Sequence, residues 1–180
     1  MPFNAWHDLP TGANPPDQLN AIVEIPRGSR NKYELDKESG LIRFDRLLYS
    51  SVHYPADYGF FPRTLAGDDD PLDVLIMVTA PTFPGCLLEV RPIGVFTMRD
   101  EKGLDEKILA VPIRDPLYDD YRGLDAVPRH YLREVEHFFS IYKELEGVTT
   151  DTMGWQDRAE AVRILETSRR TYEAMHAPHG

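Results

Sequence analysis

An acidic segment that runs directly into an apolar one constrains this chain more than any other feature of its sequence. Asp68, Asp69, Asp70 and Asp73 occupy four of six consecutive positions, and residues 74–78 that follow are all apolar. Like charges this close repel one another, and the arrangement costs least when divalent cations lie among them. Because carboxylates are hard oxygen ligands, the segment predicts a site for Mg²⁺, Mn²⁺ or Ca²⁺.

Length and charge exclude several classes of protein. A chain of 180 residues that is 42% hydrophobic can bury one substantial core, so we expect a single domain over residues 1–180. The sequence has no apolar run of 18 residues and no basic, then apolar leader, which predicts a cytoplasmic protein without a membrane segment. A net charge of −10 argues against a surface that binds nucleic acid.

Runs of β-forming residues predict a mainly β fold in the first two-thirds of the chain. They are separated by Pro, Gly and Asp clusters, and their spacing suggests a small barrel. The expected strands cover residues 21–26, 31–36, 41–46, 72–80, 86–98 and 107–113.

Two helices are expected after the strands. The first begins near Pro128 and ends just before Gly147, with an apolar side formed by Leu132, Val135, Phe138 or Phe139, Tyr142 and Leu145. The second follows a turn at residues 154–155, and its apolar side holds Ala159, Val162, Leu165 and Tyr172.

Some of the expected strands carry charged residues where a core strand would not. Glu24 interrupts an apolar run, and because burying an unpaired carboxylate is costly, it either faces water or points into a site that contains cations. A period of two places Lys32 and Glu34 on one strand face, and Asp105 and Lys107 on another. Each pair taken alone is also typical of a solvated hairpin.

Taken together, these segments resemble soluble family I inorganic pyrophosphatase of the short, bacterial type. The string from Asp68 to Leu75 carries the resemblance, and further matches follow in family order at residues 23–26, 32–34, 45–46, 54–59 and 100–107. The resemblance implies an α+β fold, mainly β, with a five-stranded OB-like barrel and two main flanking helices. It also implies an inorganic diphosphatase that hydrolyses pyrophosphate to two orthophosphates by in-line attack of a metal-activated water.

The resemblance also assigns roles to the acidic residues. Asp70 is the general base, and Asp73 bridges two metal ions. The expected metal ligands are Asp68, Asp73, Asp105, Asp100, Glu34 and Glu24, the last two acting partly through water. Several Mg²⁺ ions are implied, with Mn²⁺ as a candidate substitute and Ca²⁺ as an expected inhibitor.

Cations and hydroxyls are expected to hold the substrate. By resemblance, the phosphate-binding residues are Lys32, Arg46, Tyr58, Lys107, Tyr142 and Lys143. Two of them have ordinary alternatives, because a lysine in the last turn of a helix complements the macrodipole and Tyr142 lies on an apolar stripe. Short members of the family are commonly hexamers, so a homo-oligomer is implied. The helix at 128–146 is a candidate interface element, although its aromatic residues fit an intramolecular core equally well.

The chain departs from the family pattern in two places. Asp69 stands where the family often has glycine or asparagine, which adds a charge beside the predicted metal ligands. Residues 147–153 contain no lysine, although many relatives carry one there. The second departure concerns a peripheral contact and leaves the expected ligand set complete.

Three other functions are weighed against this interpretation. An EF-hand would need glycine where Asp73 stands and glutamate where Thr79 stands, so its spacing fails. An OB-type nucleic-acid binder would group basic and aromatic residues, whereas the grouped residues here are acidic. A hydrolase of nucleoside triphosphates would need an aromatic clamp for the base, for which only Tyr54 and Tyr58 are candidates.

Overall fold

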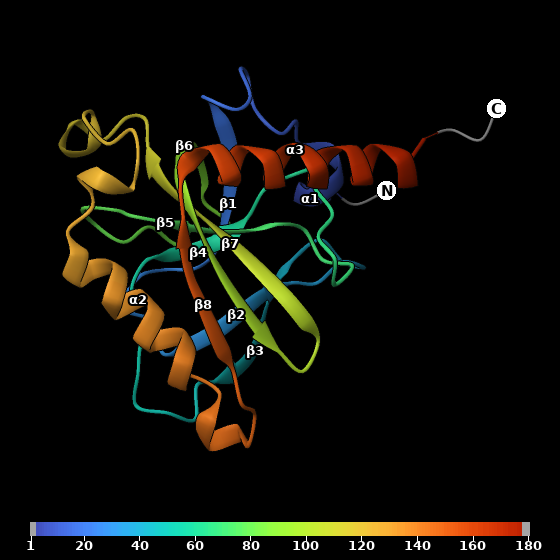
Figure 1. The fold of residues 1–180 in the computed structure, drawn as a ribbon. Coiled ribbons are helices and arrows are strands. Elements are labelled where there is room, and N and C mark those ends of the chain that lie inside the picture. Colours follow the sequence, from blue (N-terminus) through green and yellow to red (C-terminus); the bar gives the residue numbers. More distant parts are fainter. Residues whose placement is uncertain (1–2, 178–180) are drawn as a thin grey trace.

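Five strands close into a barrel in the computed structural model (Figure 1), which describes residues 3–177. They follow the order β1 (Leu19–Ile25), β4 (Asp57–Phe60), β5 (Asp73–Ile76), β7 (Gly103–Pro112) and β6 (Leu87–Asp100). The barrel is closed because β1 pairs with both β4 and β6. The mainly β, OB-like barrel with two main helices is therefore confirmed, while residues 1–2 and 178–180 of the expected domain lie outside the described part.

Two strands escaped the sequence-based prediction. The four-residue β4 contains Asp57 and Gly59, which are depleted in strands, and a Cβ on Gly59 would lie 1.8 Å from the Ile22 carbonyl oxygen of β1. β8 (Asp151–Gln156) pairs with the outer edge of β6. The turn expected at residues 154–155 is wrong, because Gly154 lies within β8, where its φ of +87° accompanies a register shift.

A separate hairpin stands beside the barrel. β2 (Asn31–Leu35) pairs with β3 (Ile42–Leu47), and both strands match the predicted positions to within one or two residues. Lys32 lies opposite Arg46 in this pairing. The hairpin thus brings together two cations that are 14 positions apart in the sequence.

Side chains that alternate along the central strands are buried on both faces. On β5, Leu75 belongs to a cluster that includes Phe138 of α2 (Arg129–Ile141). Its neighbours Val74 and Ile76 face a second cluster that includes Leu165 of α3 (Arg158–Met175). This two-sided burial explains the unbroken apolar run after Asp73. In Figure 1, α3 crosses the top of the barrel and α2 flanks its left side.

The helices differ in detail from the prediction. The first ends at Ile141 instead of near Gly147, and a separate 3₁₀ turn, Glu144–Glu146, leaves Leu145 exposed. On α3, Leu165 and Tyr172 are buried as expected, whereas Ala159 is exposed and Val162 is half-buried. The other buried residues of this helix are Ala161, Ile164 and Ser168. The remaining helical segments are α1 (Ala5–Asp8) and the 3₁₀ turns Pro116–Tyr118 and Leu124–Ala126. In residues 3–177, no helix has the length and apolar character needed to cross a membrane.

Candidate active site

One cavity of about 790 Å³ gathers every residue that the sequence nominated for the site. Its walls come from the barrel, the β2–β3 hairpin, the loop before β5, the turn between β6 and β7, and the segment after α2. The thirteen nominated residues on these walls are Glu24, Lys32, Glu34, Arg46, Tyr58, Asp68, Asp70, Asp73, Asp100, Asp105, Lys107, Tyr142 and Lys143.

A buried ammonium group joins two of the predicted metal ligands. Lys107, whose side chain is 2% exposed, places Nζ 2.9 Å from Asp73 Oδ2 and 3.0 Å from Asp105 Oδ2. The parallel pairing of β5 with β7 sets Asp73 opposite Lys107, and the period of two puts Asp105 on the same face. Burial alone would lower the pKa of Lys107, but Asp105 and Asp73 raise it well above its usual value.

Tyr58 completes this group. Its hydroxyl donates to Asp73 Oδ2 at 2.6 Å and accepts from Lys107 Nζ at 2.8 Å. Burial raises the pKa of Asp105 despite the adjacent ammonium. Lys107 and Tyr58, nominated as phosphate ligands, therefore contact the predicted metal ligands in this structure, and all three donors of the Lys107 ammonium face Tyr58, Asp73 and Asp105.

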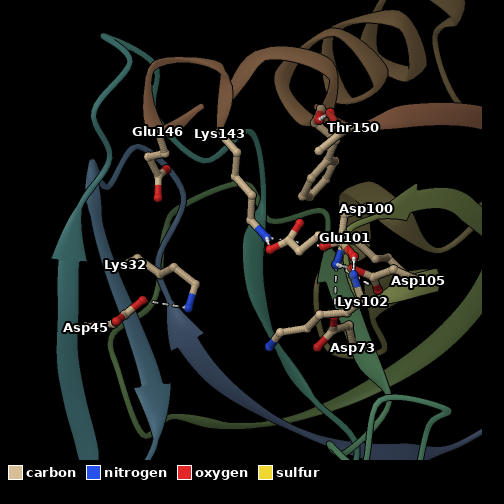
Figure 2. A network of polar contacts seen from close by, with 12 residues as sticks. Lys32, Asp45, Asp73, Asp100, Glu101, Lys102, Asp105, Lys143, Glu146 and Thr150 are labelled. Carbon is tan, nitrogen blue, oxygen red and sulfur yellow. Dashed lines mark hydrogen bonds and ion pairs between the residues drawn. The ribbon is translucent and has the colours of Figure 1, made fainter. Parts of the chain in front are cut away.

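A second lysine and acid pair lies at the turn between β6 and β7 (Figure 2). Lys143 Nζ is 3.2 Å from Asp100 Oδ2 and 3.5 Å from Glu101 Oε1. Burial raises the pKa of Asp100, but the Lys102 amide and Lys143 outweigh it and hold this pKa below its ordinary value. Lys143 follows α2 and reaches the acids instead of the helix carbonyls, so the macrodipole alternative does not describe its contacts.

The β2–β3 hairpin contributes a chain of alternating charges. Lys32 Nζ lies 3.1 Å from Glu34 Oε2 and 2.9 Å from Asp45 Oδ2, the second contact being visible in Figure 2. Arg46 contacts the same Asp45 oxygen at 2.5 Å and places Nε 2.6 Å from Glu146 Oε1. Lys32 and Arg46 are thus held side by side at the cavity wall by Asp45.

The loop before β5 presents Asp68 and Asp70. It is closed by the Ala66 amide, which donates to the Asp70 carbonyl at 2.8 Å, and by the Asp70 amide, which donates to Asp68 Oδ1 at 3.2 Å. Asp69 adopts the left-handed conformation, with φ of +65°, and its exposed side chain is not part of the cavity wall. Burial raises the pKa of Asp68, although the hydrogen bond from the Asp70 amide acts in the opposite direction.

Glu24 on β1 is buried at the base of the site, with 8% exposure. Its Oε1 accepts a hydrogen bond from the Leu35 amide at 2.7 Å. Burial is the main cause that raises the pKa of Glu24 to about 8, and the Asp73 carboxylate acts in the same direction. Of the two alternatives for this residue, the structure supports the one in which it points into the site.

The pKa of Glu24 makes the stability of the metal-free protein depend on pH. Between the ordinary value of 4.5 and about 8, the unfolded chain releases this proton while the folded protein keeps it. Stability is therefore fully present below pH 4.5 and falls as pH rises to about 8, by a few kcal/mol in order of magnitude. Burial also raises the pKa values of Asp68 and Asp105, so in EDTA Glu24→Gln is expected to reduce this fall markedly, as measured by urea unfolding at pH 5 and pH 8.

Glu34→Gln is the matched control for that experiment. Glu34 lines the same cavity, but half of its side chain is exposed. Its charge is only a minor cause of the raised pKa of Glu24, so its substitution should change the difference between pH 5 and pH 8 much less than Glu24→Gln does. An undiminished fall in Glu24→Gln would assign the pH dependence to other groups.

The cavity has the charge and donor type that hard divalent cations need. Eleven acidic and seven basic side chains line it, and no histidine or cysteine is among the described lining residues. This donor set is typical of Mg²⁺, Mn²⁺ or Ca²⁺. No three acidic, histidine or cysteine side chains of residues 3–177 already converge on one metal position. Lys32, Lys107 and Lys143 lie between the carboxylates, where they neutralise part of the excess charge.

Comparison with known proteins identifies the family of this chain. The family model described as inorganic pyrophosphatase matches residues 21–173. The chain belongs to the inorganic pyrophosphatase family. Among its relatives, the inorganic pyrophosphatase of Haloferax volcanii is 46% identical over 171 residues, which covers 94% of this chain and 97% of the relative. That of Methanosarcina acetivorans is 52% identical over 153 residues and covers 85% and 91%.

Solved structures of inorganic pyrophosphatases share the fold. The crystal structure from Thermus thermophilus superposes with a TM-score of 0.92 at 40% identity, covering 95% of this chain and 99% of that one. The Helicobacter pylori inorganic pyrophosphatase gives a TM-score of 0.89 at 38% identity, covering 92% and 99%. The likeness thus extends over 92% or more of this chain.

Sequence reasoning missed four residues of the inorganic pyrophosphatase site that contact nominated ones. Asp45 and Glu101 contact Lys32 and Lys143, while Glu146 and Lys37 contact Arg46 and Asp70. Asp45 stands next to Arg46 in a matching segment, but only strand pairing shows that it also reaches Lys32. For Glu146, which lies 100 positions from Arg46, the sequence carries no signal of the contact.

Proposed function

We propose that this chain is a divalent-metal-dependent hydrolase that splits inorganic pyrophosphate into two orthophosphates. The observation that carries the proposal is that one cavity unites all thirteen nominated residues, acids and cations together. Pyrophosphate is a small, highly charged anion. Its hydrolysis requires that oxygen charge be neutralised, that the leaving phosphate be held and that the attacking water be deprotonated.

Asp70 is positioned to act as the general base. Its side chain is 42% exposed at the cavity wall, so water reaches it, and its backbone is fixed by the loop. As Asp70 takes the proton, the water oxygen forms a bond to one phosphorus in line with the bridging oxygen. The bond from that phosphorus to the bridging oxygen breaks, and its electron pair leaves with the second phosphate.

The cations of the cavity hold the phosphate oxygens. Lys32 and Arg46 come from the hairpin, and Lys143 comes from the segment after α2. Tyr142 adds a neutral donor, because burial raises its pKa and keeps the hydroxyl protonated at neutral pH. Ammonium and guanidinium groups on two walls suit a dianionic product at each end of the substrate.

The carboxylates supply the metal ligands in this proposal. Asp68, Asp73 and Asp105 form the inner set, and Asp100, Glu34 and Glu24 surround it. When bound, Mg²⁺ supplies charge neutralisation and a water of lowered pKa, and Mn²⁺ is the substitute closest in ligand preference. The excess of acidic over basic side chains in the cavity supports this role.

Substrate preference tests the assignment. We expect turnover of pyrophosphate to exceed that of ATP greatly under Mg²⁺, because neither of the two candidate aromatic residues, Tyr54 and Tyr58, is free to clamp a nucleobase. Tyr54 is 1% exposed and packs on Phe138 with ring centroids 4.9 Å apart, while Tyr58 contacts Asp73 and Lys107. Phosphate release from each substrate at equal concentration measures the preference; equal turnover would leave a general phosphohydrolase in place of the narrow assignment.

Location, domain content and assembly are proposed from the sequence. We propose a single cytoplasmic domain over residues 1–180 that assembles into a homo-oligomer, with a hexamer expected. The side of α2 turned away from the barrel, which includes Arg129, Arg133 and His137, is exposed and offers the interface that the sequence nominated. Neither nucleic acid nor a membrane surface is expected as a partner.

A further inference from the structure

Lys37 joins the loop of the general base to the amino-terminal segment. Its Nζ forms an ion pair with Asp70 Oδ1 and donates to the Asp69 carbonyl at 3.0 Å. The same ammonium lies 5.3 Å from the ring centroid of Trp6, within the range of a cation–π contact. Lys37 lies in the turn after β2, 31 positions from Trp6 and 33 positions from Asp70, so none of these contacts is local in sequence.

Trp6 is held in place by burial and by a hydrogen bond. It is 6% exposed, and its indole Nε1 donates to the Thr64 carbonyl at 2.8 Å. Thr64, which is fully buried, accepts the Leu72 amide on Oγ1 at 2.9 Å. Through Thr64, the Trp6 ring is therefore connected by hydrogen bonds to both ends of the loop that carries Asp70.

The backbone of Lys37 is anchored to the same segment. Its carbonyl accepts a hydrogen bond from Asn4 Nδ2 at 3.0 Å, and Asn4 caps α1 by accepting from the Trp6 amide at 2.9 Å. The ammonium group is thus fixed from two sides, by the anchored chain at residue 37 and by the Trp6 ring. A lysine held in this way loses less side-chain entropy when it pairs with an acid than a free surface lysine does.

The Asp70 carboxylate has few other restraints. The hydrogen bonds that shape its loop use the Asp70 amide and carbonyl, and the side chain is 42% exposed. A general base must lie within hydrogen-bond reach of the proton it takes, and a displacement of about 1 Å can cost on the order of 10²-fold in rate. The Asp70 rotamer therefore needs a partner that fixes it.

We propose that Lys37 is a positioning residue, which holds the Asp69–Asp70 turn and the Asp70 carboxylate in place for proton transfer. This inference rests on the proposed function, in which Asp70 is the base. Lys37 acts through Asp70 and contributes to kcat, whereas Lys32, Arg46 and Lys143 bind phosphate and contribute to KM.

A double-mutant cycle of Lys37→Met and Asp70→Asn tests this inference. In the unaltered background, Lys37→Met is expected to lower kcat for pyrophosphate about 10-fold, with KM changed by less than about 2-fold. In the Asp70→Asn background, Lys37→Met should lower the residual kcat by less than about 2-fold, because the group that it positions is already lost. Equal losses in both backgrounds, or a raised KM, would overturn the inference by making Lys37 an independent or phosphate-binding group.

Two further variants separate positioning from charge and from folding. Lys37→Arg keeps a cation beside Asp70 and is expected to retain most of kcat; a loss equal to that of Lys37→Met would contradict the ion-pair role. Lys102→Met removes the same charge from another wall of the same cavity, where the Lys102 amide donates to Asp100 and not to the 68–70 loop. If Lys102→Met lowers kcat as much as Lys37→Met, a general field effect explains the loss and the positioning role fails.

Failure of this inference is distinguishable from failure of the proposed function. No pyrophosphate turnover by the unaltered chain would refute the proposed function. Turnover that drops with Asp70→Asn but not with Lys37→Met would refute the positioning role alone. Lys37 is 46% exposed, so Met is tolerated sterically, and an unchanged thermal unfolding midpoint verifies that the variant folds.

Discussion

Asp70→Asn is expected to lower kcat for pyrophosphate by roughly 10²–10⁴-fold while the protein stays folded, the usual range for loss of a general acid or base. The amide side chain is nearly the same shape but cannot take the proton. The backbone bonds that close the loop, from the Ala66 amide to the Asp70 carbonyl and from the Asp70 amide to Asp68, do not use the altered group. Steady-state kinetics and circular dichroism on the same preparation measure both parts of the expectation.

Asp73→Asn is the comparison that separates base from metal ligand. Asp73 Oδ2 accepts from Tyr58 and pairs with Lys107, which is buried and has Asp105 as its other carboxylate partner. Removing this charge should weaken Mg²⁺ binding, which a calorimetric metal titration measures directly. Equal loss of metal affinity in both variants, or near-normal kcat in Asp70→Asn, would contradict the division of roles.

Ca²⁺ is expected to bind the same cavity and inhibit, with kcat at least on the order of 10²-fold lower when it replaces Mg²⁺. Mg²⁺ demands octahedral oxygen coordination at about 2.0–2.1 Å, whereas Ca²⁺ accepts more ligands at about 2.3–2.6 Å. Asp68, Asp73, Asp100 and Asp105 come from separate strands and turns around a wide cavity, so they cannot exclude the larger ion. The longer ligand distances displace the reacting groups from the in-line arrangement.

The measurement is activity at fixed Mg²⁺ with rising Ca²⁺, beside a direct Ca²⁺ titration of metal-free protein. Binding without turnover is the expected pair of results. Full activity with Ca²⁺ as the sole cation would show that the reaction does not depend on tight coordination geometry. If Ca²⁺ inhibits but does not bind the metal-free protein, the inhibition would instead come from Ca²⁺ bound to the pyrophosphate.

The sequence predicted the barrel and the residues of the cavity because both produce recognisable patterns over short stretches of sequence. Period-two alternation marks β2 and β3, and the acidic string before residues 74–78 marks the loop and β5. β4 and β8 show no such pattern, since Gly59 is required by the approach of β1 and Gly154 by a register shift against β6. Such requirements come from tertiary packing, which propensity does not contain.

The sequence predicted which residues belong to the site better than it predicted which of them contact one another. Lys107 was nominated for phosphate, yet the parallel pairing of β5 with β7 aims its ammonium at Asp73 and Asp105. Lys37 had no assigned role, because its contacts with Trp6 and Asp70 join segments that are about 30 residues away on either side. Long-range pairing of charges is a property of the fold and cannot be read from residue type.

Phosphate release from pyrophosphate, measured with Mg²⁺ and with EDTA, decides whether this chain is a metal-dependent pyrophosphatase. We expect rapid release with Mg²⁺, negligible release with EDTA, and recovery when Mg²⁺ is restored in excess. The acidic excess of the cavity is the physical reason, because it repels the anionic substrate until divalent cations neutralise it. Sustained hydrolysis in EDTA, or none with Mg²⁺, would contradict this expectation.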